Sequence, residues 1–321
     1  MTEGVNGILN LYKPCGITSH GALSAVKRIF GVKKAGHCGT LDPMACGVLP
    51  VMLGSAVKAS EYLTDHDKRY TASVALGFST DTQDIHGSVT ERYDGPLPSL
   101  EEVRETAKGF VGVITQIPPM YSALKRNGQK LVDLARKGIS VEREGREVTV
   151  YSLDVYEKDG EIMLDVACSR GTYIRTLCHD IGEALGCHAC MKSLERTAVG
   201  RFEKSEAVSL AELESLSDAG RAALVLPTER CFDFPALVLP PFYEKLFRNG
   251  CEIYARDLGG AGKTLSENAM YRIYGEDGFF AFGKCAFFPG KSKDGQAGLA
   301  VKSVKFFKSE PAFTKYDSRI S

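Results

Sequence analysis

The sequence has no excess of charge of either sign. Its 321 residues contain 40 Lys and Arg against 40 Asp and Glu, so the formal net charge at pH 7 is zero. This balance excludes a uniformly basic protein that coats nucleic acid. It leaves a local basic groove open, because net charge does not say where the charges lie. Hydrophobic residues make up 44% of the chain and charged residues 25%, which excludes a disordered tail protein and a collagen-like fibre.

The sequence also lacks long apolar runs. The stretch from Pro43 to Val57 contains no Asp, Glu, Lys or Arg, but it has two prolines and two glycines. It is shorter than the roughly 20 residues that a membrane span needs. The first residues show no basic stretch followed by an apolar run, the pattern of a secretory signal. With ten cysteines and no such signal, we expect reduced thiols in a cytoplasmic protein that does not contact membranes.

The length corresponds to about two domains of roughly 150 residues each. Apolar periodicity and helix caps predict alternating strands and helices up to about residue 227, with capping boxes at Ser99 and Ser209. Beyond this point short β-like segments recur between glycines, which predicts a small all-β domain. The expected strands are 7–12, 48–53, 68–76, 146–156 and 161–169, the expected helices 19–30, 99–108, 129–137 and 172–185, and the expected C-terminal segments 251–254, 270–274, 279–282 and 299–307.

Residues 35–47 are expected to form a Gly-rich loop that runs into an apolar strand. This region places an acid directly before the strand: Gly36-His-Cys-Gly-Thr-Leu-Asp-Pro-Met-Ala-Cys-Gly-Val-Leu-Pro50. Pro43 fixes the chain direction and biases Asp42 toward an extended backbone. The spacing alone leaves two alternatives open. Asp42 is either the acceptor of an Asx-type turn, bonded to its own backbone, or a functional carboxylate.

This segment resembles the catalytic loop of the TruB family of tRNA pseudouridine synthases. Five further stretches resemble motifs of the same family, in the same order, between residues 7 and 202. They are the N-terminal motif at 7–19, the tyrosine motif Lys68-Arg-Tyr70, the insertion motif of the bacterial branch at 117–125, the arginine motif at 170–177 and the last catalytic-domain motif at 194–202.

The resemblance implies an α+β fold with a mixed, largely antiparallel sheet and flanking helices. We expect this catalytic domain over residues 1–228, with an RNA-binding insertion at about 116–146. A small PUA-like RNA-binding β domain would occupy residues 235–310. The second domain is favoured by the position of the C-terminal segments and by their pattern of short β-like runs between glycines.

The implied reaction converts uridine to pseudouridine in the T-loop of tRNA, at the position numbered 55. The N1–C1′ bond breaks, the uracil rotates, and the base is rejoined through C5. A carboxylate suits this chemistry, since it is ionised at pH 7 and can attack as a nucleophile or shield a cationic sugar. The product is an isomer, so the stoichiometry requires no metal, redox cofactor or cosubstrate.

The resemblance assigns Asp42 as the catalytic carboxylate and Arg175 as its partner. On the expected helix Arg175 lies about 100° from the buried stripe, so it could reach the edge of a cleft. Tyr70 would stack on the target base, and its hydroxyl could serve as general base. Leu194 would close the apolar side of the uracil pocket. His37 would either occupy the space that the flipped base leaves or contact the backbone. The residues alone leave simpler alternatives open. Arg175 would be a solvated arginine, Tyr70 and Leu194 would pack in the core, and His37 would stabilise its loop by a hydrogen bond.

The resemblance also implies RNA contacts at Lys68, Arg69, Lys125, Arg126 and Tyr173. The charge distribution fits RNA, because segment 27–34 has four basic residues and no acid, and segment 125–146 has seven basic residues against three acids. Segment 203–218 instead has five acids and one lysine. We therefore expect a basic groove bordering Asp42 and tRNA binding that weakens as salt rises.

Two other classes of function remain as alternatives. A non-catalytic tRNA-folding factor could bind through the same groove. A zinc- or thiol-dependent RNA-processing enzyme is more distant, because Cys187-His-Ala-Cys190 lacks a second ligand pair at standard spacing. We expect no metal and a monomer. The bacterial-type insertion favours a stand-alone enzyme over the guide-RNA-dependent relatives of the family.

Overall fold

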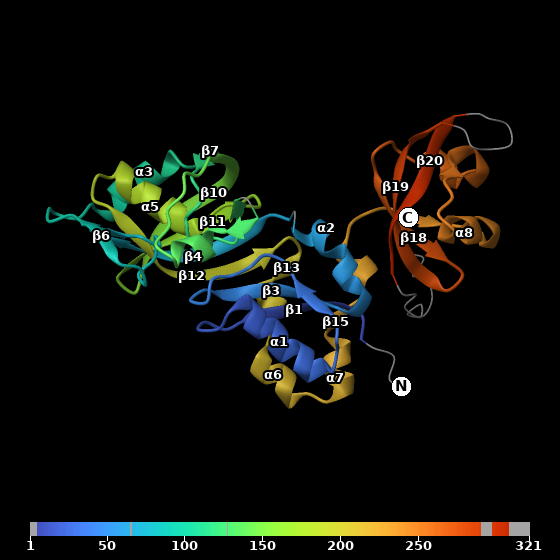
Figure 1. The fold of residues 1–321 in the computed structure, drawn as a ribbon, viewed down its shortest axis with the longest axis horizontal. Helices are drawn as coiled ribbons and strands as arrows, with labels where there is room; N and C mark the ends of the chain where they lie inside the picture. Colours follow the sequence, from blue (N-terminus) through green and yellow to red (C-terminus); the bar gives the residue numbers. More distant parts are fainter. Residues whose placement is uncertain (1–4, 65, 127, 290–296, 308–321) are drawn as a thin grey trace.

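The computed structural model describes residues 5–64, 66–126, 128–289 and 297–307. The side chain of Lys125 lies outside this description, and so do residues 308–310 of the expected PUA-like domain. The described chain forms a large lobe built on a long mixed sheet and a smaller C-terminal lobe built on a second sheet (Figure 1). Among the described residues, no helix has the length and apolar character needed to cross a membrane.

Eleven strands of the described chain form the large sheet, whose main path is β14-β1-β3-β12-β4-β11-β10-β7. The pairs are antiparallel except β1 with β14 and β3 with β12. The strands are β1 (Gly7–Lys13), β2 (Ala35–His37), β3 (Cys46–Leu53), β4 (Lys68–Leu76), β7 (Gly112–Gln116), β10 (Arg146–Lys158), β11 (Glu161–Cys168), β12 (Ala189–Val199), β13 (Phe202–Glu203), β14 (Val208–Ser209) and β15 (Val225–Leu226). Two hairpins add β5 (Phe78–Thr80) with β6 (Val89–Arg92) and β8 (Lys125–Arg126) with β9 (Gln129–Lys130).

Several helices of the large lobe begin or end where the sequence provides caps. In α1 the Thr18 side chain accepts a hydrogen bond from the Gly21 N–H, and Gly31 closes the helix in the left-handed conformation. In α3 Ser99 and Glu102 form the expected capping box. The helices are α1 (Ser19–Phe30), α2 (Ser60–Thr64), α3 (Leu100–Lys108), α4 (Leu131–Ala135), α5 (Ile174–Ala184), α6 (Leu210–Ser215) and α7 (Asp218–Ala223), with short 3₁₀ turns η1 (Gly54–Ala59), η2 (Lys204–Glu206) and η3 (Thr228–Cys231).

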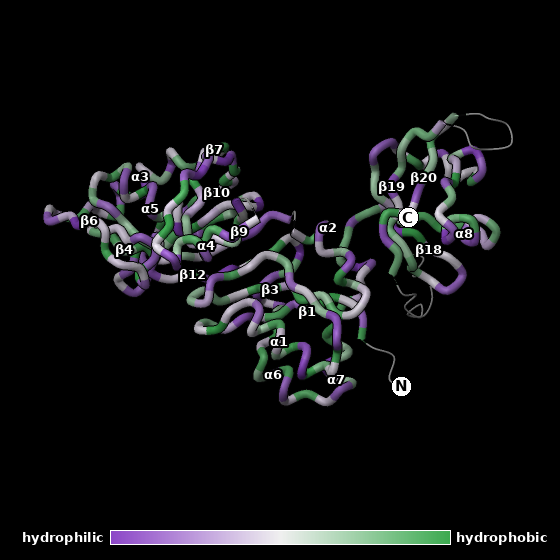
Figure 2. The backbone as a smooth tube through the Cα atoms, viewed as in Figure 1, coloured by the Kyte–Doolittle hydropathy of each residue, from purple (hydrophilic) through white to green (hydrophobic). Residues whose placement is uncertain are grey.

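The C-terminal sheet has the strand order β16-β18-β19-β20-β17. Its hydrophobic strands contrast with the hydrophilic tip of the large lobe at β6 (Figure 2), where all four residues are exposed. Its elements are β16 (Ala236–Val238), α8 (Pro241–Arg248), β17 (Ile253–Tyr254), η4 (Ala255–Leu258), η5 (Ala261–Thr264), β18 (Met270–Gly275), β19 (Gly278–Phe288) and β20 (Gly298–Phe306).

Three local expectations were wrong. The C-terminal region is not all-β, because Pro241 opens helix α8, whose Phe247 is fully buried. The helix expected over 129–137 is only α4, since Gln129 and Lys130 pair with β8 instead. The Gly-rich loop expected over 35–47 begins with β2, which pairs with the end of β3.

An aromatic cluster joins the two lobes. Tyr62 of α2 packs edge-on against Phe232 and Phe282, with ring centroids 6.3 and 5.4 Å away. The Lys58 ammonium donates to the Phe306 carbonyl at 2.6 Å. The burial of these rings stabilises one arrangement of the lobes, because aromatic side chains remove large apolar areas from water.

Candidate active site

The site lies where β3 and β12 meet in the middle of the sheet. These parallel strands share only two register pairs, Cys46 with Glu195 and Gly47 with Arg196. Gly47 has φ +112°, and a Cβ there would lie 2.2 Å from the Arg196 carbonyl oxygen. Only glycine allows this approach. The chain that enters β3 is therefore held against β12 directly after residue 42.

The loop before β3 is fastened to the turn after β1. Leu41 exchanges two hydrogen bonds with the Ser19 hydroxyl, at 2.8 and 3.0 Å. The Pro43 carbonyl accepts from the Gly16 N–H at 2.8 Å and from the Lys13 ammonium at 3.4 Å. Lys13 is fully buried, and this burial lowers the pKa of its ammonium. Bonds on both sides of Asp42 fix the position from which its carboxylate projects.

The Asp42 carboxylate pairs with Arg175 of α5. Arg175 Nε lies 2.9 Å from Oδ2 and Nη2 lies 3.4 Å from Oδ1, a two-point contact. Two backbone carbonyls orient the guanidinium, Thr82 at 2.9 Å and Tyr121 at 2.8 Å. The Arg175 side chain is 5% exposed and that of Asp42 is 36% exposed. One partner is thus locked in the protein while the other faces incoming molecules.

The Asx-turn alternative for Asp42 does not describe the structure. The turn is made by the backbone, with the Ala45 N–H donating to the Asp42 carbonyl at 3.1 Å. The carboxylate is directed to Arg175. Arg175 itself lies deeper than the expected cleft edge, because the residues of β7 and of the loop after β5 also cover this side of α5.

Tyr70, Leu194 and Arg196 share one face of the sheet. In the β4–β12 register Tyr70 lies opposite Arg196, and Leu194 lies opposite Ala72, two residues along. Leu194 and Tyr70 are each 8% exposed and belong to one apolar cluster with Leu41. This cluster forms an apolar surface beside the Asp42–Arg175 pair.

Arg196 is a buried cation that the sequence did not single out. It is 1% exposed, and its guanidinium donates to the Val48 carbonyl at 2.8 Å and to the Gly39 carbonyl at 2.9 Å. These two residues flank the Asp42 loop. Burial raises the pKa of the Tyr70 hydroxyl, while the charge of Arg196 and a hydrogen bond from it act in the opposite direction. Arg196 therefore connects the loop geometry to the electrostatics of Tyr70.

Of the other expected site residues, His37 and Lys68 lie on the sheet near Arg196. His37 is half-buried on β2, and burial together with the Arg196 charge lowers the pKa of its imidazole. Lys68 is buried, and its ammonium donates to the Thr64 carbonyl at 2.9 Å and to the His66 carbonyl. The Lys68 ammonium thus bonds backbone carbonyls of nearby residues, and its side chain exposes little surface to RNA.

The remaining expected RNA contacts lie around the rim. Arg69 is exposed and forms an ion pair with Asp165 at 2.9 Å. Tyr173 is half-buried, its N–H donates to the Gln116 side chain at 2.9 Å, and burial raises the pKa of its hydroxyl. Arg126 is exposed on the β8–β9 hairpin. The Lys125 side chain is outside the described residues.

A hollow of about 370 Å³ borders the supports of Arg175. It lies between the loop after β5 and the insertion, and its lining includes Gln83, Tyr121, Arg143 and His179. Because Tyr121 holds Arg175 through its carbonyl, the insertion contributes directly to the Asp42–Arg175 arrangement.

Potential metal ligands lie elsewhere. In the described part of the chain, Glu91, Glu183 and His188 bring three ligand atoms within 4.8 Å of one another, and His188 already pairs with Glu183 at 2.8 Å. Cys187 and Cys190 are buried free thiols. None of these residues contacts Asp42 or Arg175 among the described contacts.

Comparisons with known proteins identify the class. A family model described as "TruB family pseudouridylate synthase (N terminal domain)" matches residues 27–174, and one described as "tRNA pseudouridylate synthase B C-terminal domain" matches residues 175–233. Two solved structures share the fold. "Crystal Structure of a Cbf5-Nop10-Gar1 Complex" matches with a TM-score of 0.69 and 28% identity, and the match covers 94% of this chain and 85% of that chain. "Structure of H/ACA RNP bound to a substrate RNA containing 2'-deoxyuridine" matches with a TM-score of 0.66 and 26% identity, and the match covers 95% of this chain and 86% of that chain. Fold and site thus define a pseudouridine synthase, an isomerase, and the expected fold class is confirmed.

Curated relatives give the family. The chain is 41% identical over 279 residues to tRNA pseudouridine synthase B of Clostridium perfringens strain 13, covering 86% of this chain and 93% of the relative. It is 46% identical over 274 residues to tRNA pseudouridine synthase B of Azoarcus sp. strain BH72, covering 85% and 91%. The chain belongs to the TruB family of tRNA pseudouridine synthases, as its motifs predict.

Proposed function

We propose that this isomerase converts uridine to pseudouridine at position 55, in the T-loop of tRNA. The observation that supports this best is the two-point contact between Asp42 and Arg175 beside the apolar surface of Tyr70 and Leu194. The contact leaves the carboxylate partly exposed and fixed in direction. The apolar surface can accept a flat base that has left its stack.

In the proposed reaction Asp42 acts on the sugar. Its carboxylate either attacks C1′ or shields the cationic sugar while the N1–C1′ bond breaks. Arg175 keeps the carboxylate oriented and prevents it from turning away from C1′. The detached uracil then rotates and bonds to C1′ through C5, and any Asp42–C1′ bond breaks as this bond forms. The C5 hydrogen leaves as a proton and N1 takes up a proton, so the product is an isomer of the substrate.

Tyr70 is the proposed acceptor of the C5 proton. Burial disfavours its phenolate, and the adjacent Arg196 charge offsets part of this cost. The same ring would stack on the base, with Leu194 closing the other apolar side. His37, half-buried on β2, would fill the space left in the RNA by the flipped nucleotide.

The proposed substrate is tRNA bound as a folded molecule. The insertion at 116–146 and the C-terminal domain at 235–310, which we propose to be PUA-like, would hold the RNA outside the site. Of the described rim residues, Arg69, Arg126 and Tyr173 stay candidates for RNA contact. We further propose that the protein acts as a monomer in the cytoplasm.

Mapping of pseudouridine in tRNA tests the proposal. Unmodified tRNA incubated with the wild-type protein should gain pseudouridine at position 55, and Asp42→Asn should yield none. Asp94→Asn makes the same chemical change at an exposed position and should match the wild type. Product at other positions only, or full product with Asp42→Asn, would contradict the assignment.

The alternative function is a non-catalytic tRNA-folding factor. The exposed rim, not the Asp42–Arg175 pair, would carry that activity. Asp42→Asn should then rescue the phenotype of cells that lack the protein while forming no pseudouridine. Failure of this variant to rescue, at wild-type abundance, would favour the catalytic function.

A further inference from the structure

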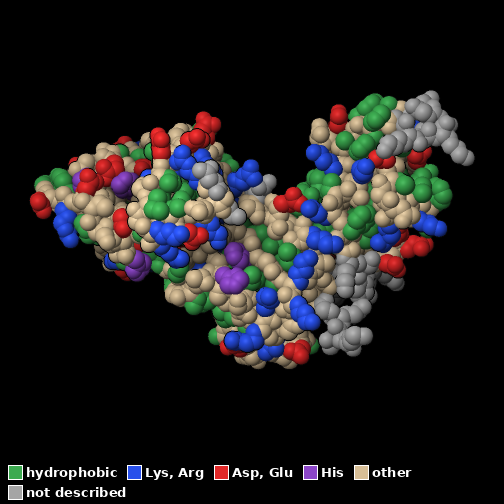
Figure 3. Space-filling view, viewed as in Figure 1, with side chains coloured by type: hydrophobic (Ala, Val, Ile, Leu, Met, Phe, Trp, Pro, Cys, Tyr) green, Lys and Arg blue, Asp and Glu red, His purple; other side chains and the backbone are tan. Residues whose placement is uncertain are grey.

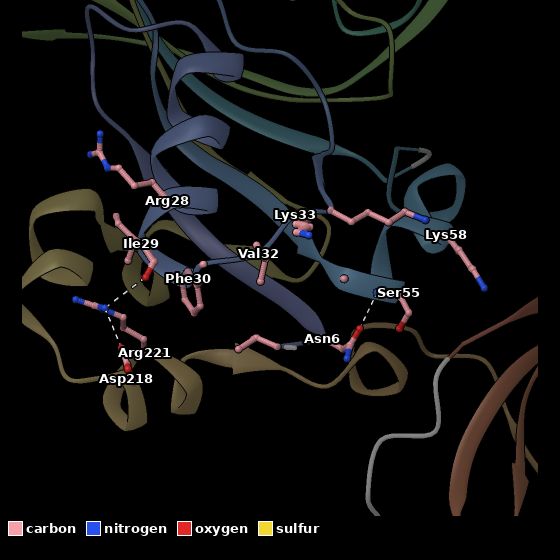
Figure 4. A pocket seen from close by; sticks show the side chains of 14 residues that line it. Asn6, Arg28, Ile29, Phe30, Val32, Lys33, Ser55, Lys58, Asp218 and Arg221 are labelled. Carbon is pink, nitrogen blue, oxygen red and sulfur yellow. Dashed lines mark hydrogen bonds and ion pairs between the residues drawn. The ribbon is translucent and has the colours of Figure 1, made fainter. Parts of the chain in front are cut away.

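A second feature of the large lobe lies away from Asp42. A hollow of about 890 Å³ lies between the end of α1, the start of β1 and the η1 turn (Figure 4). We refer to it as the basic hollow, because five cations and one acid are among its lining residues. These are Arg28, Lys33, Lys34, Lys58, Arg221 and Asp218.

The charge of the basic hollow is only partly neutralised inside the protein. Arg221 pairs with Asp218 at 3.1 Å, and Arg28 pairs with Glu214 at 3.3 Å. The three lysines have no carboxylate partner among the described residues. Lys33 and Lys34 are exposed, and the Lys58 ammonium donates to a backbone carbonyl, which leaves its charge uncompensated. The hollow therefore presents a positive surface to an incoming anion.

The form of the hollow favours a chain of phosphates over one small anion. It lies at the C-terminal end of α1, where the helix dipole is negative and a single buried anion is disfavoured. Its lysines are solvated and spread over a wide opening, a pattern that follows an RNA backbone without reading its bases. Lys and Arg side chains gather along the notch between the large lobe and the C-terminal lobe (Figure 3).

The sheet connects the basic hollow to the active site. β2 begins beside the hollow at Ala35, opposite Leu53, and ends at His37, opposite Val51, in the direction of the Asp42 loop. The hollow thus borders the far end of β3, roughly 23 Å from the loop at about 3.3 Å per residue.

We propose that the basic hollow binds backbone phosphates of the substrate RNA, roughly 23 Å along the sheet from the loop that carries Asp42. The inference deepens the proposed function and rests on it. Lys33 and Lys34 would supply the principal charges, with Lys58 extending the contact toward the C-terminal lobe. The hollow would add affinity and fix the direction of the RNA, and it would leave the chemistry unchanged.

The salt dependence of tRNA binding tests the hollow. Lys33→Gln/Lys34→Gln should bind tRNA about tenfold more weakly at low salt, and the slope of log K against log salt should fall by about 1.4. The single-turnover rate at saturating RNA should equal that of the wild type. Lys108→Gln/Lys158→Gln removes two exposed lysines elsewhere and should change neither quantity. RNA trimmed to the target uridine and its immediate neighbours, which is too short to reach the hollow, should bind the wild type and the Lys33→Gln/Lys34→Gln variant equally.

Each of the following results would overturn the inference. One is a Lys33→Gln/Lys34→Gln variant that binds whole tRNA with the same affinity and the same salt slope as the wild type. The other is an equal loss with trimmed RNA, which would place the two lysines at the active-site cleft. Binding of inorganic phosphate alone, with RNA binding unchanged, would also count against it. A wild-type protein that binds tRNA but forms no pseudouridine would instead refute the proposed function, and the salt slope would still decide the hollow.

Discussion

Replacing Arg175 separates the orientation of Asp42 from the rest of the site. Arg175→Met keeps most of the side-chain length and removes the charge and all donors. It breaks the two contacts to Asp42 and leaves the Thr82 and Tyr121 carbonyls without this partner. Arg175→Lys keeps a charge on the side chain but cannot span the carboxylate and both carbonyls at once.

The expected loss follows from the geometry. A hydrogen bond to a charged group contributes about 1.5–3 kcal/mol. Asp42 is 36% exposed, so water replaces part of what Arg175 supplies, and we take about 3 kcal/mol for the two contacts together. At about 1.4 kcal/mol per tenfold change, Arg175→Met should lower the rate of the chemical step by about 100-fold or more. Arg175→Lys should fall between this variant and the wild type.

Tritium release measures the step directly, because rejoining the base through C5 frees the C5 hydrogen. Single-turnover rates should be compared at saturating tRNA labelled at C5 of uridine, with tRNA affinity and thermal unfolding measured on the same samples. A folded Arg175→Met protein with a rate within threefold of wild type would refute the role of the pair. Unchanged rate with weakened RNA binding would instead assign Arg175 to the RNA contact.

Three more changes test neighbouring features. Gly47→Ala should lower the melting temperature of the protein much more than Gly16→Ala does. Both glycines have positive φ, but only at Gly47 would the new Cβ meet a backbone oxygen. Equal melting temperatures of the two variants would contradict the β3–β12 contact. Tyr70→Phe should keep tRNA affinity but slow tritium release by about 100-fold or more, and a wild-type rate would exclude the hydroxyl as proton acceptor. Burial raises the pKa of Asp180, so this residue binds its proton more tightly in the folded state and its contribution to stability is lost as pH rises through the folded pKa. Asp180→Asn should therefore raise the free energy of unfolding, relative to the wild type, by more at pH 7 than at pH 4. A variant whose unfolding has the same pH dependence as the wild type would contradict this.

Local chemistry in the sequence determined much of the fold. The caps at Thr18 and Ser99 and the glycine at Gly31 mark helix ends because they satisfy backbone groups within a few residues. The strand at 68–76 was predicted with its observed bounds, since its β-forming residues fit a half-buried pleated surface. The error at Pro241 arose where the buried face of α8 decided the outcome, and the error at Gln129 arose where the local β8–β9 hairpin replaced the first helical turn.

The tertiary structure alone decided how the site is supported. The order of motifs made Asp42 and Arg175 candidates, but their contact depends on carbonyls at Thr82 and Tyr121, which belong to other segments. Arg196 lies in a recognisable motif, yet nothing in its neighbours along the chain predicts a buried cation that binds both sides of the Asp42 loop. The sequence showed the basic segment 27–34, but only the tertiary structure brings Lys58 and Arg221 beside it in the basic hollow. Periodicity and caps act over a few residues, whereas these contacts join positions far apart in the chain, so only packing of the sheet brings them together.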